Sequence, residues 1–562
     1  MYMMRSVTQS GLSFEDLIGA YIKKKKRMLP SSTPLVLVGP VVGEVRNTRA
    51  RVLLELDCRI TVVAVDAASG EPMCAPVEFQ ANHPLTLTLR LPSTDAHYTV
   101  IFLGGSSRTP LQLDTGKPAV ARFSAYDASD STAELSFATL SCNNQSFSYP
   151  KPWWWWWWLP GRSAVDEWAQ LARHIQQFPN SLRFVLHAGD CYYQDHGLEE
   201  EDTPSQIMAC KSKSAYVLAR RHLITTTVDG TFVNRPSSEW ECFRGTIEEL
   251  YKSTVRVTWG HPPNREVLAS ISNLFLPDDH EYRDDFGIPC VDRDPHSIET
   301  WLSAIAHKTV LAYQRSLWLE EEEEEEEEEE QEEKNATPES FGFARTYGRT
   351  KLLVLDTLMA RTFQYDSGHA NRYFGDVQWA WFEKQLCDGP SLLIISMPQP
   401  LFFLPRWFAA TIGTLQDDLQ QRLNSKQFGN ECDALVRALR AWKMRSPERR
   451  IVILGGDIHI SGCCTVTEAD TGKPFALQLT TSGIKNGVAS LEWAALATGM
   501  VASNLMKENV AGVTYHHDKY TSWSAYSTLC VPGNTEGPVA NTQIAIYDQK
   551  NCFPHPLYVA HI

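Results

Sequence analysis

Short apolar runs recur from Glu134 onward, and most of them end in polar loops that contain Asp, His or Cys. The runs are Leu135–Leu140, Phe184–Leu186, Leu274–Leu276, Leu352–Leu355, Leu392–Ile395 and Ile451–Leu454. Helical patterns separate these runs over 164–178, 377–386 and 433–444. The alternation of strands and helices predicts an α/β layered domain, and ligand sites in such domains form where strands end.

The region before Glu134 has a different pattern, with short strand-like runs and no helical stripe. The clearest runs are Leu35–Val38, Ala50–Leu56 and Tyr98–Leu103, and Gly, Pro, Ser and Asp separate them. This spacing is typical of a β-sandwich. Because 562 residues are too many for one ordinary domain, we predict a tail over 1–33, a β-sandwich domain over 34–130 and an α/β domain over 131–562.

Two low-complexity tracts interrupt the α/β pattern, and we interpret both as insertions. Trp153 to Trp158 are six consecutive tryptophans, which neither a helix nor a strand can bury on one face. The alternative interpretation is an exposed aromatic cluster that contacts a partner or a membrane interface. Residues 320–333 hold 13 glutamates, which carry most of the net charge of −15. Because the rest of the chain is nearly neutral, we expect no specific nucleic-acid binding.

The cellular compartment is predicted from what the sequence lacks. No run of eighteen apolar residues is present, and the N-terminus has no apolar core of a secretory signal. The 13 cysteines are scattered without framework spacing, which favours reduced thiols. We therefore expect an intracellular, cytoplasmic protein. The basic run from Lys23 to Arg27 is a weak membrane contact, a nuclear-import signal or simply a solvated helix end.

The first chemically unusual loop is Gly189-Asp190. An aspartate at a strand end can bridge two cations that lie about 3.5–4 Å apart. Tyr193, three residues later, could add a phenolate, which favours an ion such as ferric iron over magnesium. A lone aspartate in this position is otherwise a common turn or helix-cap residue.

The second loop, Asp278 to Glu281, places two carboxylates and an imidazole directly after a strand and Pro277. Such a density of charge at a strand end indicates a metal site. Asp279 could bind a second ion, and His280 could donate a proton to a leaving oxygen. The alternative is a surface turn with an ion pair to Arg283.

The third loop contains Asp457 and His459, whose spacing allows each side chain to reach a different ion. Cys142 follows the first apolar run and could bind the same ion as Tyr193 and His459. The alternative for Cys142 is a buried structural cysteine. Three such loops in order, each after an apolar strand, together predict a two-metal site.

With these motifs the chain resembles the alkaline phosphatase D (PhoD-like) family of the calcineurin-like metallophosphatases, over about residues 134–545. The matching segments are Ser141-Cys142, Gly189 to Tyr193, Asp278 to Glu281, Leu355 to Thr357 with Arg361, Tyr373 to Phe382 and Gly456 to His459. The resemblance implies a four-layer metallophosphatase-type β-sandwich flanked by helices. The region with Val38 to Gly43 is similar to the small immunoglobulin-like sandwich often found ahead of such domains.

The resemblance also implies a ligand set for two or more metal ions, an iron and a calcium or other divalent cation. Cys142, Asp190, Tyr193 and His459 would hold the iron, and Asp190, Asp279 and Asp457 would hold the second ion. His280 matches the catalytic histidine of the wider superfamily. Arg361 matches the second arginine of the family's Asp-Thr-Arg-x-x-Arg pattern and would hold phosphate oxygens. Leu358 stands where the first arginine is found.

We therefore predict a metal-dependent phosphoester hydrolase that cleaves phosphomonoesters or phosphodiesters with a metal-bound hydroxide. One alternative is a catalytically weak protein with a metallophosphatase fold that acts as a protein or membrane interaction scaffold, an interpretation based on Leu358, the Trp tract and the basic run. Another is an oxidase that uses the iron-like site. Asp279 and Asp457 argue for a second, non-redox ion and therefore against an oxidase.

Overall fold

The computed structural model describes most of the chain. The described residues are 34–130, 132–145, 166–179, 181–195, 203–209, 214–287, 289–319, 340–359, 361, 372–412, 422–423, 425, 427–481, 483–486, 490–533, 542–548, 551 and 555–561. The predicted N-terminal tail, the Trp tract and the Glu tract lie outside these residues.

The first part of the chain forms two β-sheets that enclose their own core. One sheet has the order β5-β2-β1-β8, with β1 (Leu35–Arg46), β2 (Arg49–Leu56), β5 (Pro84–Arg90) and β8 (Gln112–Leu113). The other contains β3 (Ile60–Asp66), β4 (Val77–Phe79), β6 (His97–Gly104), β7 (Thr109–Pro110) and β9 (Val120–Ser124). Buried side chains from both sheets, such as Leu54 and Phe102, pack between them. The three runs predicted as strands form β1, β2 and β6.

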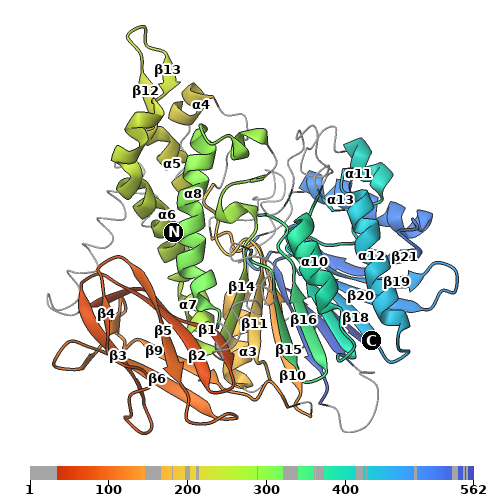
Figure 1. The fold of residues 1–562 in the computed structure, drawn as a ribbon, viewed down its shortest axis with the longest axis horizontal. Coiled ribbons are helices and arrows are strands. Elements are labelled where there is room, and N and C mark those ends of the chain that lie inside the picture. The colour runs from red at the N-terminus through yellow and green to blue at the C-terminus, as the bar shows by residue number, and fades with distance from the viewer. Residues whose placement is uncertain are drawn as a thin grey trace, which may run out of the picture.

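Two larger sheets form the rest of the molecule (Figure 1). The first has the order β14-β11-β10-β22-β23-β24, with β10 (Leu135–Leu140), β11 (Phe184–Ala188), β14 (Ser272–Leu276), β22 (Ala525–Val531), β23 (Gln543–Asp548) and β24 (Tyr558–His561). The second has the order β15-β16-β17-β18-β20-β19-β21, with β15 (Phe343–Tyr347), β16 (Thr350–Val354), β17 (Leu392–Ser396), β18 (Arg450–Gly455), β19 (Ser461–Glu468), β20 (Pro474–Thr480) and β21 (Val513–Thr521). All six apolar runs are strands, with ends within two residues of those predicted.

The apolar runs are continuous because both faces of each central strand are buried. Side chains alternate between the faces of a strand. In β16, Leu352 faces the core shared by the two sheets, whereas Leu353 faces the opposite core. The parallel pairings β10–β11–β14 and β16–β17–β18–β20 are typical of strands with this fully apolar pattern.

Helices cover the outer faces of the two sheets. On the first sheet lie α3 (Glu167–Gln177) and α7 (Pro262–Ser270), and on the second lie α10 (Gly375–Gln385) and α12 (Gly429–Met444). The side chain of Asp166 caps α3 by accepting from the backbone N–H of Trp168. The predicted helical patterns correspond to α3, α10 and α12.

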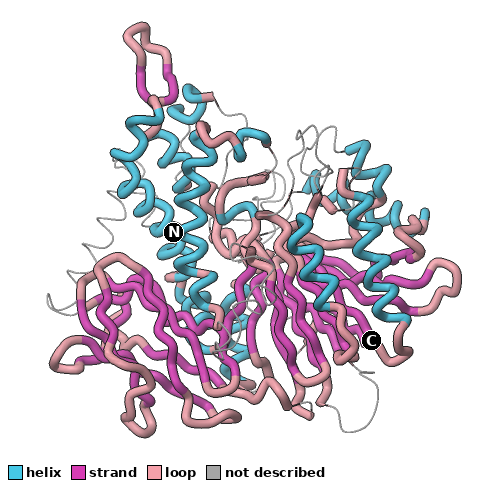
Figure 2. Tube along the Cα trace, viewed as in Figure 1, coloured by secondary structure: helices cyan, strands magenta, loops and turns pink. Residues whose placement is uncertain are grey.

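A helical insertion between β11 and β14 and other short elements lie above the strand ends (Figure 2). The insertion contains α4 (Pro204–Ala209), α5 (Ala215–His222), a hairpin of β12 (Ile224–Thr226) and β13 (Phe232–Asn234), η1 (Ser237–Phe243) and α6 (Arg244–Trp259). After β14 come η2 (Asp279–Glu281), η3 (Cys290–Arg293), α8 (Ile298–Tyr313) and η4 (Arg315–Leu317). The remaining helices are α11 (Arg406–Ile412) and α13 (Ser490–Met506).

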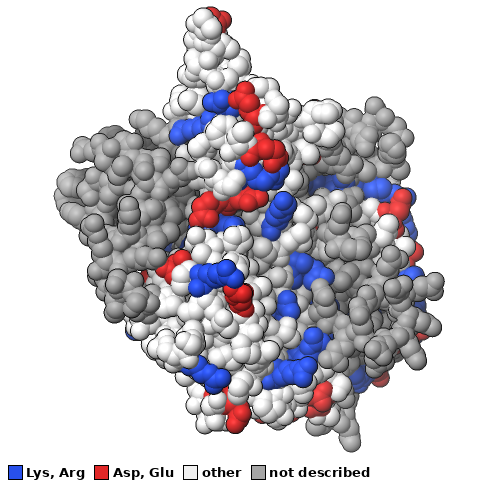
Figure 3. All heavy atoms as spheres, turned by 60° about the vertical axis from the view of Figure 1, so that its left-hand side comes forward, with Lys and Arg blue, Asp and Glu red and all other residues white. Residues whose placement is uncertain are grey.

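The surface carries both signs of charge. On the face drawn in Figure 3, lysine and arginine side chains are interspersed with aspartate and glutamate side chains. Within the described part of the chain, no helix combines the length and the apolar character that crossing a membrane requires.

Candidate metal centre

The predicted loops from the two sheets meet at one place. Cys142 follows β10, Asp190 follows β11, Asp278 follows β14 and Asp457 follows β18. The carboxyl ends of parallel strands share one edge of a sheet, so these loops converge where the two sheets face each other. The backbone N–H of Asn143 donates to the carbonyl of Asp190 (2.8 Å), which joins the first two loops.

Tight backbone geometry distinguishes these loops. The φ angles of Cys142 (54°), Asp190 (54°), Asp457 (65°) and His459 (55°) all lie in the left-handed region. Left-handed backbone is uncommon for residues other than glycine and is concentrated at functional sites. Here it occurs in three loops that each carry predicted ligands.

Glycines allow the loops to approach one another. A Cβ atom on Gly456 would lie 2.6 Å from the Ser141 hydroxyl oxygen and 2.7 Å from the Ala188 carbonyl oxygen. Gly189 has a φ of 97°, and a Cβ atom there would lie 2.9 Å from that of Asp278. A larger residue at Gly456 would therefore push loops of the two sheets apart, and one at Gly189 would separate two loops of the first sheet.

The four side chains predicted to hold iron lie together. The Tyr193 hydroxyl is 3.2 Å from Oδ2 of Asp190 and 3.3 Å from Nε2 of His459. The Cys142 thiol is fully buried beside the Tyr193 hydroxyl, and its Sγ lies 3.6 Å from the Asp457 carbonyl oxygen. Thiolate, phenolate, imidazole and carboxylate donors are thus available at one point, a donor set that favours a transition metal over magnesium.

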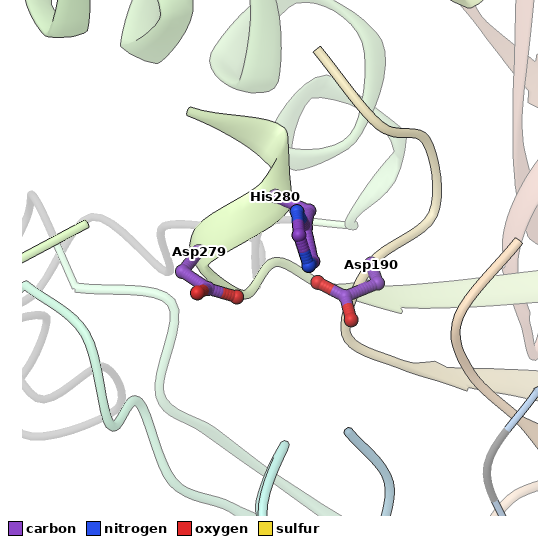
Figure 4. A group of neighbouring side chains, drawn as sticks. All are labelled: Asp190, Asp279 and His280. Atoms are coloured by element: carbon purple, nitrogen blue, oxygen red, sulfur yellow. The ribbon is translucent and has the colours of Figure 1, made fainter. Parts of the chain in front are cut away.

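Asp190 also belongs to two groups of possible oxygen ligands. The carboxylates of Asp190 and Asp279 and the imidazole of His280 offer ligand atoms within 4.8 Å of one another (Figure 4). The carboxylates of Asp190, Asp278 and Asp457 form a second such group. One carboxylate is therefore shared by both groups, as a bridge between two ions requires.

Asp195 and Tyr193 hold His280 in position. Nδ1 of His280 lies 2.9 Å from Oδ1 of Asp195, a carboxylate that is itself buried. The ring of Tyr193 stacks on the imidazole with a centroid distance of 4.0 Å. A bond from Nδ1–H to Asp195 leaves Nε2 as the nitrogen that can exchange a proton.

The carboxylate of Glu281 holds the second loop in place through three hydrogen bonds. Its Oε2 accepts from the backbone N–H of Asp278 (3.0 Å), and its Oε1 accepts from the backbone N–H of Cys191 (2.6 Å) and the amide of Gln314 (2.9 Å). Because Glu281 is buried and Arg283 pairs with Asp292 (2.8 Å), the alternative interpretation of this loop as a surface turn paired with Arg283 is wrong.

The electrostatics of the centre favour a bound cation. Burial, with neighbouring negative charges, raises the pKa of Asp190 and of Asp278 well above the usual carboxyl value. Burial likewise raises the pKa of Asp279 to about 7. Burial lowers the pKa of His280, but the charges of Asp195, Asp279 and Asp190 outweigh it and raise that pKa well above its usual value.

Two buried carboxylate oxygens of the centre have no hydrogen-bond partner among the described residues. They are Oδ1 of Asp190 and Oδ2 of Asp278. Buried polar atoms are almost always satisfied, and a metal ion is one of the few groups that can satisfy a carboxylate oxygen surrounded by other carboxylates. The residues present therefore fit a metal centre.

Several residues of the centre are not among the predicted site residues. Asp278 could have been predicted from the sequence, since it directly follows a strand and a proline. The sequence gives no indication of Asp195, Arg422 and Asn486, because each lies far in sequence from the groups it contacts. The amide of Asn486 lies 2.9 Å from Nε2 of His459 and 3.2 Å from the Tyr193 hydroxyl, and Arg422 pairs with Asp457.

Arg361 lies beside the acidic groups. It is buried, and its Nη2 donates to the carbonyl of Phe286 (2.8 Å). Its positive charge acts on Asp278 and partly opposes the rise of that carboxyl's pKa. The role of Arg361 in holding phosphate oxygens stays a prediction.

Comparison with known proteins gives a match at the level of structure. No protein-family model and no curated protein sequence matches the chain. A solved structure described as "Structure of PhoD" matches over 95% of this chain and 93% of that chain, with a TM-score of 0.58 and 11% sequence identity. The chain has the fold of PhoD. The PhoD fold confirms the predicted mixed α/β architecture and, at the level of fold, the resemblance inferred from the motifs.

A second solved structure is a purple acid phosphatase from yellow lupin (Lupinus luteus) seeds. It has a TM-score of 0.49 and 10% identity, covering 93% of this chain and 73% of that chain. The PhoD match covers nearly the whole length of this chain.

Proposed function

We propose that this protein is a metal-dependent phosphoester hydrolase that cleaves phosphomonoesters or phosphodiesters at a two-metal centre. The observation that supports the proposal is the position of Asp190. Its carboxylate contacts the Tyr193 hydroxyl (3.2 Å), and it also offers a ligand atom within 4.8 Å of those of Asp278 and Asp457. The PhoD fold supports a phosphoesterase over other classes of metal-dependent hydrolase. No observation on the described residues favours the alternative of a non-catalytic scaffold.

The proposed ligands divide by the chemistry of their donor atoms. Cys142, Asp190, Tyr193 and His459 would hold iron, since thiolate and phenolate donors suit a redox-capable ion. Asp190, Asp279 and Asp457 would hold calcium or another divalent cation, which prefers oxygen donors. We add Asp278 to the second set because its ligand oxygen lies within 4.8 Å of those of Asp190 and Asp457.

When bound, the two cations would supply a hydroxide at neutral pH and would neutralise phosphoryl charge. Side chains of this protein would orient the phosphate group and protonate the leaving oxygen. His280, fixed through Nδ1 by Asp195, presents Nε2 as the acid that protonates the leaving oxygen. Arg361 binds phosphate oxygens and so orients the phosphorus for in-line attack. The charge of Asp195 opposes the effect of burial on the pKa of His280 and favours the protonated imidazole that a general acid requires.

We also propose the finer architecture that the motifs predicted. Residues 34–130 would be an immunoglobulin-like sandwich domain, and residues 131–562 would be a four-layer metallophosphatase-type catalytic domain. The separate core between the two N-terminal sheets supports the first boundary. The helices on the outer faces of the two larger sheets support the four layers.

Elemental analysis of the purified protein, combined with turnover of an aryl phosphate monoester and diester, tests the proposed function. We expect bound iron with a second metal, and hydrolysis of at least one ester. A protein that binds no transition metal and hydrolyses neither ester contradicts the proposal.

A further inference from the structure

Two buried arginines flank the carboxylates of the centre from different parts of the chain. Arg361 comes from the segment after β16, and Arg422 from the segment before α12. Their exposed fractions are 4% and 5%. Arg422 forms an ion pair with Oδ2 of Asp457, whereas the charge of Arg361 acts on Asp278. Each guanidinium therefore lies next to a different carboxylate of the same ligand group.

The ring of Tyr373 is influenced by the charges of both arginines. The guanidinium carbon of Arg361 lies 6.0 Å from the centre of the Tyr373 ring, and the Tyr373 hydroxyl donates to the Gln399 side chain (2.6 Å). Burial raises the pKa of Tyr373, and the charges of Arg361 and Arg422 oppose that rise. The charges of both arginines therefore act on the same phenol ring.

Leu358, which stands where the resemblance predicts an arginine, does not contribute to this pair of arginines. It is buried in the core shared by the two large sheets, and its backbone N–H donates to Oδ1 of Asp356 (2.8 Å). A side chain at this position is therefore part of the apolar core. Leu358 therefore offers no charged group to the centre.

We propose that Arg422 is a substrate-binding residue that forms, with Arg361, a two-arginine clamp for the non-bridging oxygens of the phosphate group. This inference rests on the proposed function and deepens it. Arginine suits the task because its planar fork pairs with two oxygens of a phosphate group. The ion pair with Asp457 keeps the buried guanidinium of Arg422 oriented toward the centre when no phosphate group is bound.

The competing explanation is that Arg422 only balances the charge of Asp457. In that case its removal disturbs metal binding and leaves the intrinsic affinity for phosphate unchanged. The two explanations therefore differ in which affinity changes, and they can be separated by measuring phosphate binding and metal content on the same samples.

The test is calorimetric titration of inorganic phosphate into the metal-loaded full chain, with R422A and R422Q compared with the unmodified protein. We expect both variants to bind phosphate about 10-fold or more weakly, since a hydrogen-bonded charged group is lost, while elemental analysis finds their metal content unchanged. R440A is the matched control, because Arg440 pairs with Glu468 and the Ala511 carbonyl instead of the centre. Its phosphate affinity should stay unchanged.

Three results overturn the clamp. They are unchanged phosphate affinity in the Arg422 variants, loss of metal from them, and absence of phosphate binding to the unmodified protein. If R422A does not fold, the phosphate affinity of R422Q tests the clamp, because the glutamine amide can still donate to Asp457. Arg422-dependent phosphate binding by a protein that hydrolyses no ester supports the clamp while it contradicts the proposed function, so the two failures are distinguishable.

Discussion

Asp190 is the residue on which both proposed ion sites depend, because its carboxylate contacts Tyr193 of the first set and lies beside Asp278 and Asp457 of the second. We expect D190N to reduce ester hydrolysis by about 100-fold to 1,000-fold, since a neutral amide cannot bridge two cations and several kcal/mol of charge stabilisation are lost. Steady-state kinetics with elemental analysis measure this. D470N, a change in an exposed turn, is the control. Full activity with unchanged metal content in D190N would refute the assignment.

Asp195 acts through His280 and is a positioning residue. We expect D195N to lower kcat by roughly 10-fold, as outer-shell partners do. The carboxylate stabilises the imidazolium, so its removal lowers the pKa of His280. If His280 is the acid, the alkaline limb of the pH–kcat profile moves to lower pH. A lower kcat with an unmoved limb would show that His280 is not the titrating acid.

Individual residues also show which contacts the motifs predicted and which they did not. Asp190, Tyr193 and His459 were predicted as neighbours and are in contact. The motif assigned Asp279 alone to the second ion, whereas the carboxylates of both Asp278 and Asp279 belong to groups of possible ligands with Asp190. The start of η2 at Asp279 and the capping of that turn by Glu281 decide where each side chain points.

At the level of loops and strands, the close approach of the β18 loop to the first sheet leaves no room for a side chain at Gly456. We expect G456A to destabilise the protein by about 1–3 kcal/mol, the usual cost of overpacking, and to lower its metal content, because the added Cβ would meet Ser141 and Ala188. Denaturant unfolding and elemental analysis measure the two effects.

The matched control is G389A. A Cβ atom on Gly389 would have no other atom within 4 Å, and its backbone isn't in the left-handed region. This variant should keep both its stability and its metal content. Equal destabilisation of G456A and G389A would mean that the loop contact does not matter.

The elements themselves follow closely from local pattern. Apolar runs of three to six residues form strands because both of their faces are covered, and the helices between them carry the apolar stripes that cover those faces. The insertion between β11 and β14 could not be predicted in the same way. Its helices α4 to α6 are held by contacts with distant elements, such as Tyr216 with Glu299 of α8.

At the scale of the whole molecule, metal removal should change how stability depends on pH. Burial raises the pKa of Asp190 and Asp278 above the usual carboxyl value, and those of Asp279 and Glu281 to about 7. The folded metal-free protein then binds more protons than the unfolded chain between about pH 4 and these raised values. Its stability falls as the pH rises through that window.

We therefore expect the chelator-treated protein to have a lower Tm at pH 8 than at pH 6. Metal-loaded protein should gain stability relative to it as pH rises, because metal binding needs deprotonated ligands. Thermal unfolding at both pH values, with and without chelator, measures this. A metal-free protein that becomes more stable from pH 6 to pH 8 would contradict the raised carboxyl pKa values.

Local patterns of residue type were enough to predict the strands, the order of the ligand-bearing loops and the family resemblance, because side-chain period and strand ends are short-range properties. The rest depends on how the two sheets pack face to face. This packing joins Cys142, Asp190 and Asp457 into one centre. It also provides the supporting contacts of Asp195 and Asn486 and places Arg422 beside Asp457. No sequence spacing encodes these contacts, since each joins segments that only the shared core between the sheets brings together.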